Sequence, residues 1–252
     1  FLTSPMQKSV KVITGFTIID NPYYRSEIMK ESWQNIGDLV AQPSETFLRI
    51  KSQPRWGVAF VVFYLFSVIL LWAIAPYTQQ VMSQGMAAAE APPEQLQTIA
   101  NVMGTVIIFV GPIFAVVGFL ISSALLKLGA RYLLKNETLR FRHIYAAILH
   151  IALINCIIQL VNTALLLVFR DIATVKSAAD FKMIPGLHML FDPETNVKLL
   201  LFLSYINPLS IWPIAVMAIA IAVFADMEKN RARVTAVVLW IIGVLFETLL
   251  TN

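Results

Sequence analysis

The chain has 252 residues, of which 58% are hydrophobic and only 13% are charged, and its formal net charge is +4. Soluble domains carry about 25% charged residues, so this composition and a mean hydropathy of +0.73 exclude an ordinary soluble protein and indicate an integral membrane protein. The single cysteine, Cys156, lies in a hydrophobic stretch without a disulfide partner or companion ligands, and we interpret it as a packing residue.

Two short helices are expected before the first hydrophobic stretch. Ser26 fits the cap of an amphipathic helix that ends before Pro43, and Ser44 fits the cap of a second helix. We expect both to pack against the protein's own cytoplasmic loops, with docking of a partner or of lipid as the alternative. Residues 1–42 are therefore assigned to a cytoplasmic N-terminal segment and residues 43–252 to a transmembrane domain.

Five stretches without Asp, Glu, Lys or Arg follow, and most reach the ~20 residues that a helix needs to cross a bilayer. They are Trp56–Ala75, Val102–Leu126, Ile144–Phe169, Leu199–Phe224 and Val234–Phe246. Their apolar residues are continuous and do not alternate with polar ones, which favours helices. The predicted fold class is all-α: a polytopic membrane protein with a five-helix transmembrane bundle and short cytoplasmic N-terminal helices.

Basic residues alternate between the segments that join these stretches. The N-terminal segment and every second connection after it hold 15 Lys and Arg residues together, whereas the remaining connections and the C-terminus hold 4. The positive-inside rule therefore predicts a cytoplasmic N-terminus and an external C-terminus. The net positive charge reflects this topology, so we expect membrane lipids as neighbours and no nucleic-acid partner.

The second stretch has small residues along one side of the expected helix. They are Gly104, Gly111, Ala115, Gly118 and Ser122. Because helices in lipid associate through close packing, these residues predict a face packed tightly against a neighbouring helix. A gating hinge at Gly111 and Pro112 is the alternative interpretation.

The third stretch is the most polar. Asn155, Gln159 and Asn162 fall within roughly 60° of one another around a helix, and we call them the amide stripe. Lipid offers amides no hydrogen bonds, so the stripe is expected to face other helices or a wet cavity; interhelical bonding and a substrate or subunit site both fit. His143 and His150 share a face, but no carboxylate or thiolate completes a site, so we expect no metal and no cofactor.

The fourth stretch is interrupted by Pro208 and Pro213. Proline lacks a backbone donor and disfavours helix at the preceding residue, so Val197–Ile206 is expected to form a separate short helix and the span to cover about 209–224. Broken helices form binding sites in transporters, which makes Asn207 a candidate. A simple loop-to-helix junction is the alternative.

Several of these features together resemble a known family. Pro43-x-x-Thr46-Phe47 precedes the five stretches, the second stretch is rich in glycine, and Asn207-Pro208-Leu209-Ser210-Ile211-Trp212 opens the fourth. From Pro43 to Leu250 the chain resembles the Ypt-interacting-protein (Yip) domain family, in its prokaryotic form. The resemblance implies a non-catalytic protein of the bacterial cytoplasmic membrane. Eukaryotic members are linked to vesicle trafficking, and some prokaryotic members occur alongside exporter components.

Two classes of function follow. The first is a non-enzymatic scaffold or accessory subunit that associates with other integral membrane proteins, such as an exporter complex, or with copies of itself. The second is a small transporter or channel that uses the amide stripe and Asn207. We favour the first, because the sequence has a small-residue packing face but no Walker loop, His-Glu-x-x-His or Gly-x-Ser-x-Gly pattern. Glu247, near the end of the fifth stretch, is expected at the outer interface or paired with a basic group.

Overall fold

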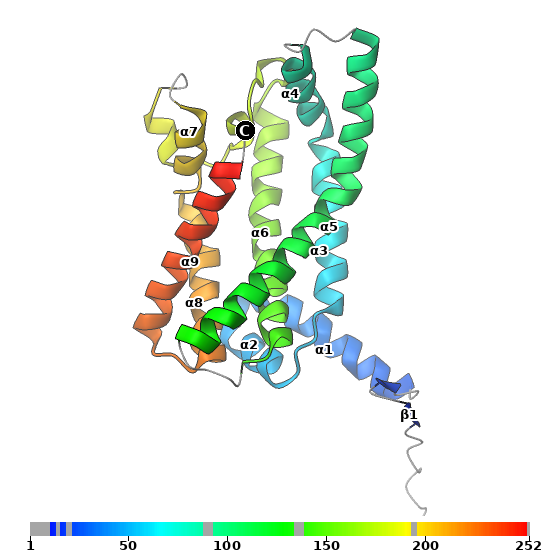
Figure 1. Ribbon diagram of the computed structural model, residues 1–252, viewed down its shortest axis with the longest axis vertical. Helices are drawn as coiled ribbons and strands as arrows, with labels where there is room; N and C mark the ends of the chain where they lie inside the picture. Colours follow the sequence, from blue (N-terminus) through cyan, green and yellow to red (C-terminus); the bar gives the residue numbers. More distant parts are fainter. Residues whose placement is uncertain are drawn as a thin grey trace, which may run out of the picture.

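The computed structural model describes residues 11–13, 16–18, 22–87, 93–133, 139–192 and 196–250. Four of its helices are long and apolar enough to cross a membrane, and a bent pair of helices makes a fifth crossing when the pair counts as one span. The long helices stand side by side, with shorter helices at both ends (Figure 1). The expected all-α membrane bundle is therefore confirmed.

The first crossing is the bent pair. Helix α3 (Gly57–Ala73) and helix α4 (Ala75–Ala87) meet at an angle of 60°. The predicted span Trp56–Ala75 ends at this break, but the chain beyond it is helical where only a connection was expected. Pro76 explains the break, since it lacks an N–H group for the preceding turn and disfavours helix at the residue before it.

The second crossing, α5 (Pro93–Leu133), is much longer than the predicted stretch of Val102–Leu126. The part of α5 that qualifies as a membrane span, Thr98–Arg131, has 34 residues. At 1.5 Å per residue this part is about 51 Å long, well above the ~30 Å of a hydrocarbon core. Pro112 lies inside the helix, and Figure 1 shows α5 change direction along its length, as expected where a proline interrupts the backbone hydrogen bonds.

The third crossing, α6 (Phe141–Phe169), lies in the middle of the bundle (Figure 1). It packs against α3, α5 and α8 along its length and against α1 and α2 at its beginning. The predicted stretch, Ile144–Phe169, ends at the same residue as α6 and begins three residues later.

The predicted break in the fourth stretch is confirmed. A short helix α7 (Val197–Ser204) is followed by a 3-10 turn η4 (Pro208–Ser210) and the spanning helix α8 (Ile211–Ala225). The last crossing is α9 (Lys229–Leu250), which packs against α7 and α8. Three further 3-10 turns lie between α6 and α7: η1 (Ile172–Thr174), η2 (Ala178–Phe181) and η3 (Leu187–Leu190).

Two helices precede the bundle, and both begin earlier than predicted. Helix α1 (Pro22–Ala41) starts at a proline, so Ser26 lies inside it and is not its cap. Helix α2 (Pro43–Ser52) also starts at a proline, one residue before Ser44. Proline suits the first helical position, where its missing N–H group is not needed. An antiparallel pair of strands, β1 (Lys11–Ile13) and β2 (Phe16–Ile18), lies upstream.

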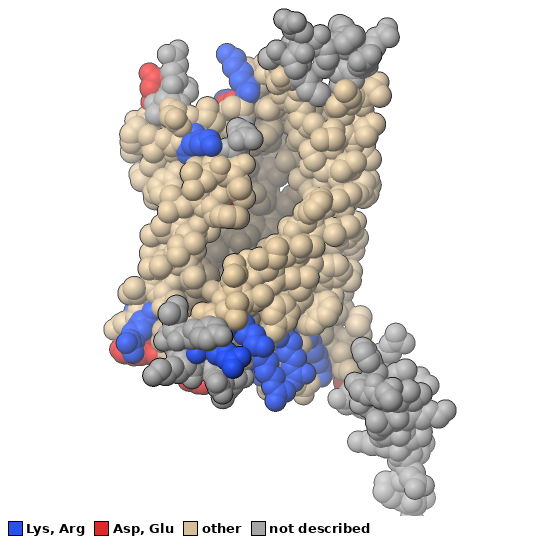
Figure 2. Space-filling view, in the orientation of Figure 1, with Lys and Arg blue, Asp and Glu red and all other residues tan. Residues whose placement is uncertain are grey.

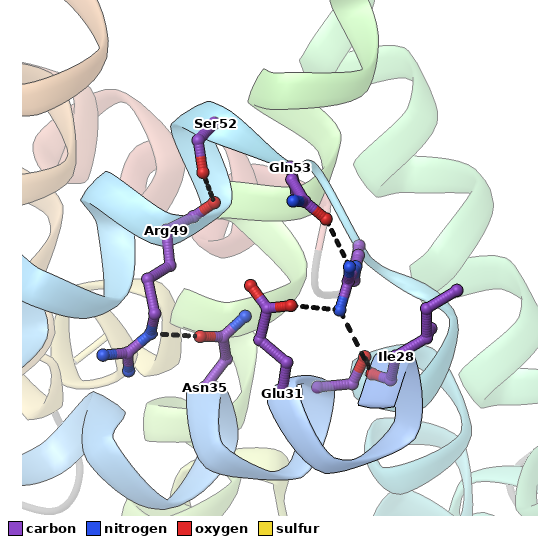
Figure 3. A network of polar contacts seen from close by, with 8 residues as sticks. Ile28, Glu31, Asn35, Arg49, Ser52 and Gln53 are labelled. Carbon is purple, nitrogen blue, oxygen red and sulfur yellow. Dashed lines mark hydrogen bonds and ion pairs between the residues drawn. The ribbon is translucent and has the colours of Figure 1, made fainter. Parts of the chain in front are cut away.

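Polar contacts join α1 to α2 and to the segment between α2 and α3 (Figure 3). The Arg49 guanidinium donates to Asn35 Oδ1 at 2.8 Å and to Asp38 Oδ2 at 2.7 Å. Arg55 forms an ion pair with Glu31. These contacts fix the two helices as a hairpin beneath the bundle.

The hairpin packs against the transmembrane helices themselves, where only contacts with loops were expected. Phe47 and Ile50 of α2 are fully buried, and the Phe47 ring meets the ring of Phe224 on α8 edge to face. Lys51 donates to the carbonyl of Val223 and to Asp226 Oδ1, both at 2.7 Å. The ammonium thereby satisfies acceptors at the C-terminal end of α8, where the helix dipole favours a cation.

The two ends of the bundle differ in charge and in packing. Lys and Arg side chains gather at the end that carries α1, α2 and the α8–α9 connection, on the face drawn in Figure 2. We call it the basic end and the opposite one the far end. The largest group of buried apolar side chains lies mainly in the half of the bundle next to the basic end, and includes Leu39, Phe47 and Leu149.

Candidate functional site

Two adjoining cavities of about 440 and 430 Å³ lie in the far half of the bundle. The first is bordered by α3, α5 and α6, and the second by α6, α8 and α9. Six side chains line both cavities, and all are polar or charged: Asn155, Gln159, Asn162, Lys182, Tyr205 and Glu247. Helix α6 therefore forms the common wall of a single polar region.

The cavities are reached from the side of the bundle. Helix α5 packs against α3, α4 and α6, whereas α9 packs against α7 and α8. Figure 2 shows the surface hollowed between α5 and α9, in front of α6. In a bilayer this opening faces the lipid rather than the water on either side.

The three members of the amide stripe have different environments. Asn162 is buried; its amide donates to the carbonyl of Phe181 at 2.7 Å, and its oxygen accepts from the N–H groups of Met183 at 2.9 Å and Ile184 at 3.3 Å. It holds the loop after η2 in place. Asn155 and Gln159 are exposed to the cavities and make no hydrogen bond with the described parts of the chain.

Three side chains from separate segments form a polar chain across the cavity lining. Lys182 donates to the Tyr205 hydroxyl at 3.1 Å, and its ammonium lies 4.3 Å from the centre of that ring. The Tyr205 hydroxyl in turn donates to Glu247 Oε1. Burial lowers the pKa of Lys182, and the charge of Glu247 opposes that shift. Burial also raises the pKa of Tyr205, so the phenol stays protonated and acts as the donor.

Asn207 lines the second cavity, but its side chain is committed to the backbone. Its oxygen accepts from the N–H groups of Leu209 at 3.0 Å and Ser210 at 3.1 Å, and its amide donates to the carbonyl of Ser204 at 2.9 Å. These contacts cap the turn that leads into α8. In this structure Asn207 therefore caps the junction between α7 and α8.

The small residues of α5 do not all face the same neighbour. Gly104 is buried, and a Cβ there would lie 3.4 Å from the Gln79 amide of α4; a Cβ on Gly111 would lie 3.7 Å from a methyl of Leu71 on α3. Ala115 is half-buried and packs against the core. A Cβ on Gly118 would meet no neighbouring atom of the described chain within 4 Å, and Ser122 is exposed. Among these five residues, Gly104 and Gly111 lie close to a neighbouring helix and Ala115 packs against the core, whereas Gly118 and Ser122 do not take part in a tightly packed face.

The histidines and the cysteine are separated from one another. His150 is buried, and its Nδ1 lies 2.7 Å from the carbonyl oxygen of Ala146. Cys156 is buried and lines the first cavity. The described ranges contain no group of three or more His, Cys, Asp or Glu side chains able to hold a metal ion.

Comparison with known families matches the Yip1 domain to residues 37–250. The chain belongs to the Yip1 domain family. The matched region begins inside α1 and contains every transmembrane crossing and the whole cavity lining. No curated protein and no solved structure matches the chain. The division of the chain into segments 1–42 and 43–252 stays a prediction.

Sequence reasoning missed two cavity residues of this Yip1 domain. Lys182 lies in the connection between α6 and α7, outside the predicted hydrophobic stretches. Tyr205 follows α7 and lies inside the fourth stretch, where it was not singled out. A signal was nevertheless present, because Lys182 stands between the apolar residues Phe181 and Met183-Ile184, with Asp180 as the nearest charge in the sequence. A cation surrounded by apolar residues indicates a buried or partnered ammonium.

Proposed function

We propose that this Yip1 domain protein is a non-enzymatic accessory subunit that associates sideways with another integral membrane protein at the opening between α5 and α9. The opening itself is the observation that supports this function. Behind this lateral opening, the amides of Asn155 and Gln159 make no hydrogen bond with the described parts of the chain, and lipid offers them none. Covering the opening with a neighbouring protein is therefore favourable.

Membership in a non-catalytic membrane family supports the same proposal. Covalent catalysis requires an activated nucleophile beside a base, and the described cavity lining offers only a phenol in that position. Lys182, Tyr205 and Glu247 are connected, but the hydroxyl in their centre has its pKa raised and its proton committed to a carboxylate.

We further propose that the protein lies in a bacterial cytoplasmic membrane with its basic end in the cytoplasm. The alternation of Lys and Arg between connections supports this orientation. The opening between α5 and α9 then belongs to the outer half of the bilayer, and a partner at this site makes its contacts in that half. An exporter component is one class of partner that would fit.

A transporter is the second candidate, and the environment of Asn155 and Gln159 favours it. Two amides without partners in the described chain, inside a cavity, are typical of a place where a polar solute binds. The buried side chains of the basic half oppose it, because Phe47, Ile50 and their neighbours fill that half of the bundle. A transport cycle would need those packed helices to separate.

Photo-crosslinking in intact membranes tests the accessory role. A photoreactive residue at Ala115 on α5 or at Gly243 on α9 lies in the cavity lining. Phe114 and Ile242, their neighbours in the sequence, are exposed outside it and serve as matched controls. We expect a discrete protein adduct from the two lining positions and none from the controls. Equal adducts at all four positions, or no protein adduct at the lining positions, would contradict the proposal, and an adduct with a second copy would identify the partner as the chain itself.

A further inference from the structure

The lining of the first cavity is divided into an apolar side and a polar side. The apolar side comes mainly from α3 and α5 and includes Phe63, Leu70, Leu71 and Phe119. The polar side comes from α6, the loop after η2, and the far ends of α7 and α9. A molecule that fills the cavity therefore meets hydrocarbon on one side and hydrogen-bonding groups on the other.

The polar side carries one charge of each sign. Lys182 and Glu247 are the only charged side chains in the described lining of either cavity. An ammonium has three donors, and Lys182 uses one of them on Tyr205. Glu247 is exposed, and a carboxylate has about four acceptor positions. The amides of Asn155 and Gln159 add both donors and acceptors beside the two charges.

The volume of the cavities limits the size of a molecule that can bind there, and the position of the opening limits where that molecule comes from. Volumes of about 440 and 430 Å³ lie in the range of sites for small molecules, ~300–1,000 Å³. A membrane-spanning helix ~30 Å long and ~10 Å across takes roughly 2,400 Å³, so no such helix fits inside. Because the opening faces lipid, the molecules that reach it most readily are those dissolved in the bilayer.

From these features we infer that the cavity binds a single amphiphile with a zwitterionic head and an apolar chain. The anionic group of the head pairs with Lys182 and its cationic group with Glu247, while Asn155 and Gln159 bond to the neutral polar atoms between them. The chain lies against α3 and α5 and leaves through the opening. A head with one charge only would satisfy one of the two residues and be repelled by the other.

This binding goes beyond the proposed accessory role, because it needs no second protein. The test uses the full chain, purified alone and placed in nanodiscs that contain equal amounts of phosphatidylethanolamine and phosphatidylglycerol with the same acyl chains. Native mass spectrometry then measures which lipid stays bound after the nanodisc is removed. We expect one retained phosphatidylethanolamine, preferred over phosphatidylglycerol by about tenfold. Retention of no lipid, or of both lipids equally, would overturn the inference.

Charge variants separate specific binding from a general effect on folding. Glu247→Gln leaves Lys182 as the only charged side chain in the described lining. The lipid preference of the protein is therefore expected to shift from phosphatidylethanolamine toward phosphatidylglycerol. Lys182→Gln is expected to lower retention of both phospholipids by about tenfold. Lys198→Gln is the control, since Lys198 is exposed and outside both linings. An unchanged preference in Glu247→Gln would contradict the inference.

A double variant covers the case in which Lys182→Gln fails to fold. Asn155→Leu with Gln159→Leu removes two amides that make no hydrogen bond with the described chain, so the fold is expected to remain stable. Phosphatidylethanolamine retention should still fall, because the head loses its neutral partners. Full retention by a folded double variant would exclude these amides from the site. Loss of lipid binding with intact crosslinks at Ala115 and Gly243 would leave the accessory role standing.

Discussion

At the scale of single residues, the polar side chains of the cavity lining are of two kinds. Some form hydrogen bonds that stabilise the fold, and others face the cavity without a bond to the described parts of the chain. Asn155, Gln159 and Asn162 look equivalent in sequence, since they share a helix face and an amide group. The structure distinguishes them through the loop after η2, which folds back over only one of them. That difference could not be predicted from the sequence, because it depends on contacts between segments about 20 residues apart.

Replacing Asn162 should therefore destabilise the protein more than replacing Asn155. Asn162→Leu removes the partner of three backbone groups of the loop, of which the N–H of Ile184 is buried, and this costs about 1–3 kcal/mol. Asn155→Leu removes no such bond and should stay within about 0.5 kcal/mol of the wild type. Thermal unfolding in the same detergent compares the two variants directly. Equal unfolding temperatures would show that the loop contact is absent in the folded protein.

At the scale of whole elements, hydropathy predicted the helices whose own residues are apolar and missed those that are helical although their sequence is polar. The end of α6 and the junction before α8 were predicted from apolar length and from prolines, both of which act locally. Helix α4 and the beginning of α5 were missed, because glutamines make their sequences polar. Gln79 lies beside Gly104 in the contact between these two helices. The contact between α4 and α5 stabilises both segments as helices, although their own composition does not indicate a membrane span.

Two glycines of α5 provide a matched test of its packing. Replacing either glycine by leucine gains a similar amount of helix propensity, about 1 kcal/mol. At Gly111 the larger side chain meets Leu71, and overpacking costs about 1–3 kcal/mol. At Gly118 there is open space. We expect a lower unfolding temperature for Gly111→Leu and an unchanged or higher one for Gly118→Leu; the reverse order would contradict the packing described for α5.

At the scale of the whole molecule, the two halves of the bundle have different roles. The basic half is filled by apolar side chains and tied together by the α1–α2 hairpin. The far half contains the cavities and the opening. The sequence predicted a bundle of apolar membrane-spanning helices and the gathering of basic residues at one end, since both follow from composition along the chain. It could not predict which helices separate, because that depends on how α5 bends relative to α9.

The proposed orientation of the molecule rests on its charged ends. In a background with Cys156 replaced by serine, Asn230→Cys at the basic end should be protected from a membrane-impermeant thiol reagent in intact cells. Lys176→Cys at the far end should react, and both residues are exposed. Rupturing the membrane should make Asn230→Cys reactive and so confirm that the cysteine is accessible. Reaction of Asn230→Cys but not of Lys176→Cys in intact cells would mean the opposite orientation.

The central claim is that the bundle is open between α5 and α9 in the membrane, and cysteine crosslinking tests it most directly. One double variant, Phe63→Cys with Phe119→Cys, joins α3 to α5 where the two rings lie 5.2 Å apart. The other, Ala115→Cys with Gly243→Cys, faces across the opening. With a short thiol crosslinker in native membranes and Cys156 replaced, we expect the first pair to react and the second to remain unlinked. Efficient crosslinking of Ala115→Cys to Gly243→Cys would show that α5 and α9 close on each other and would contradict the account.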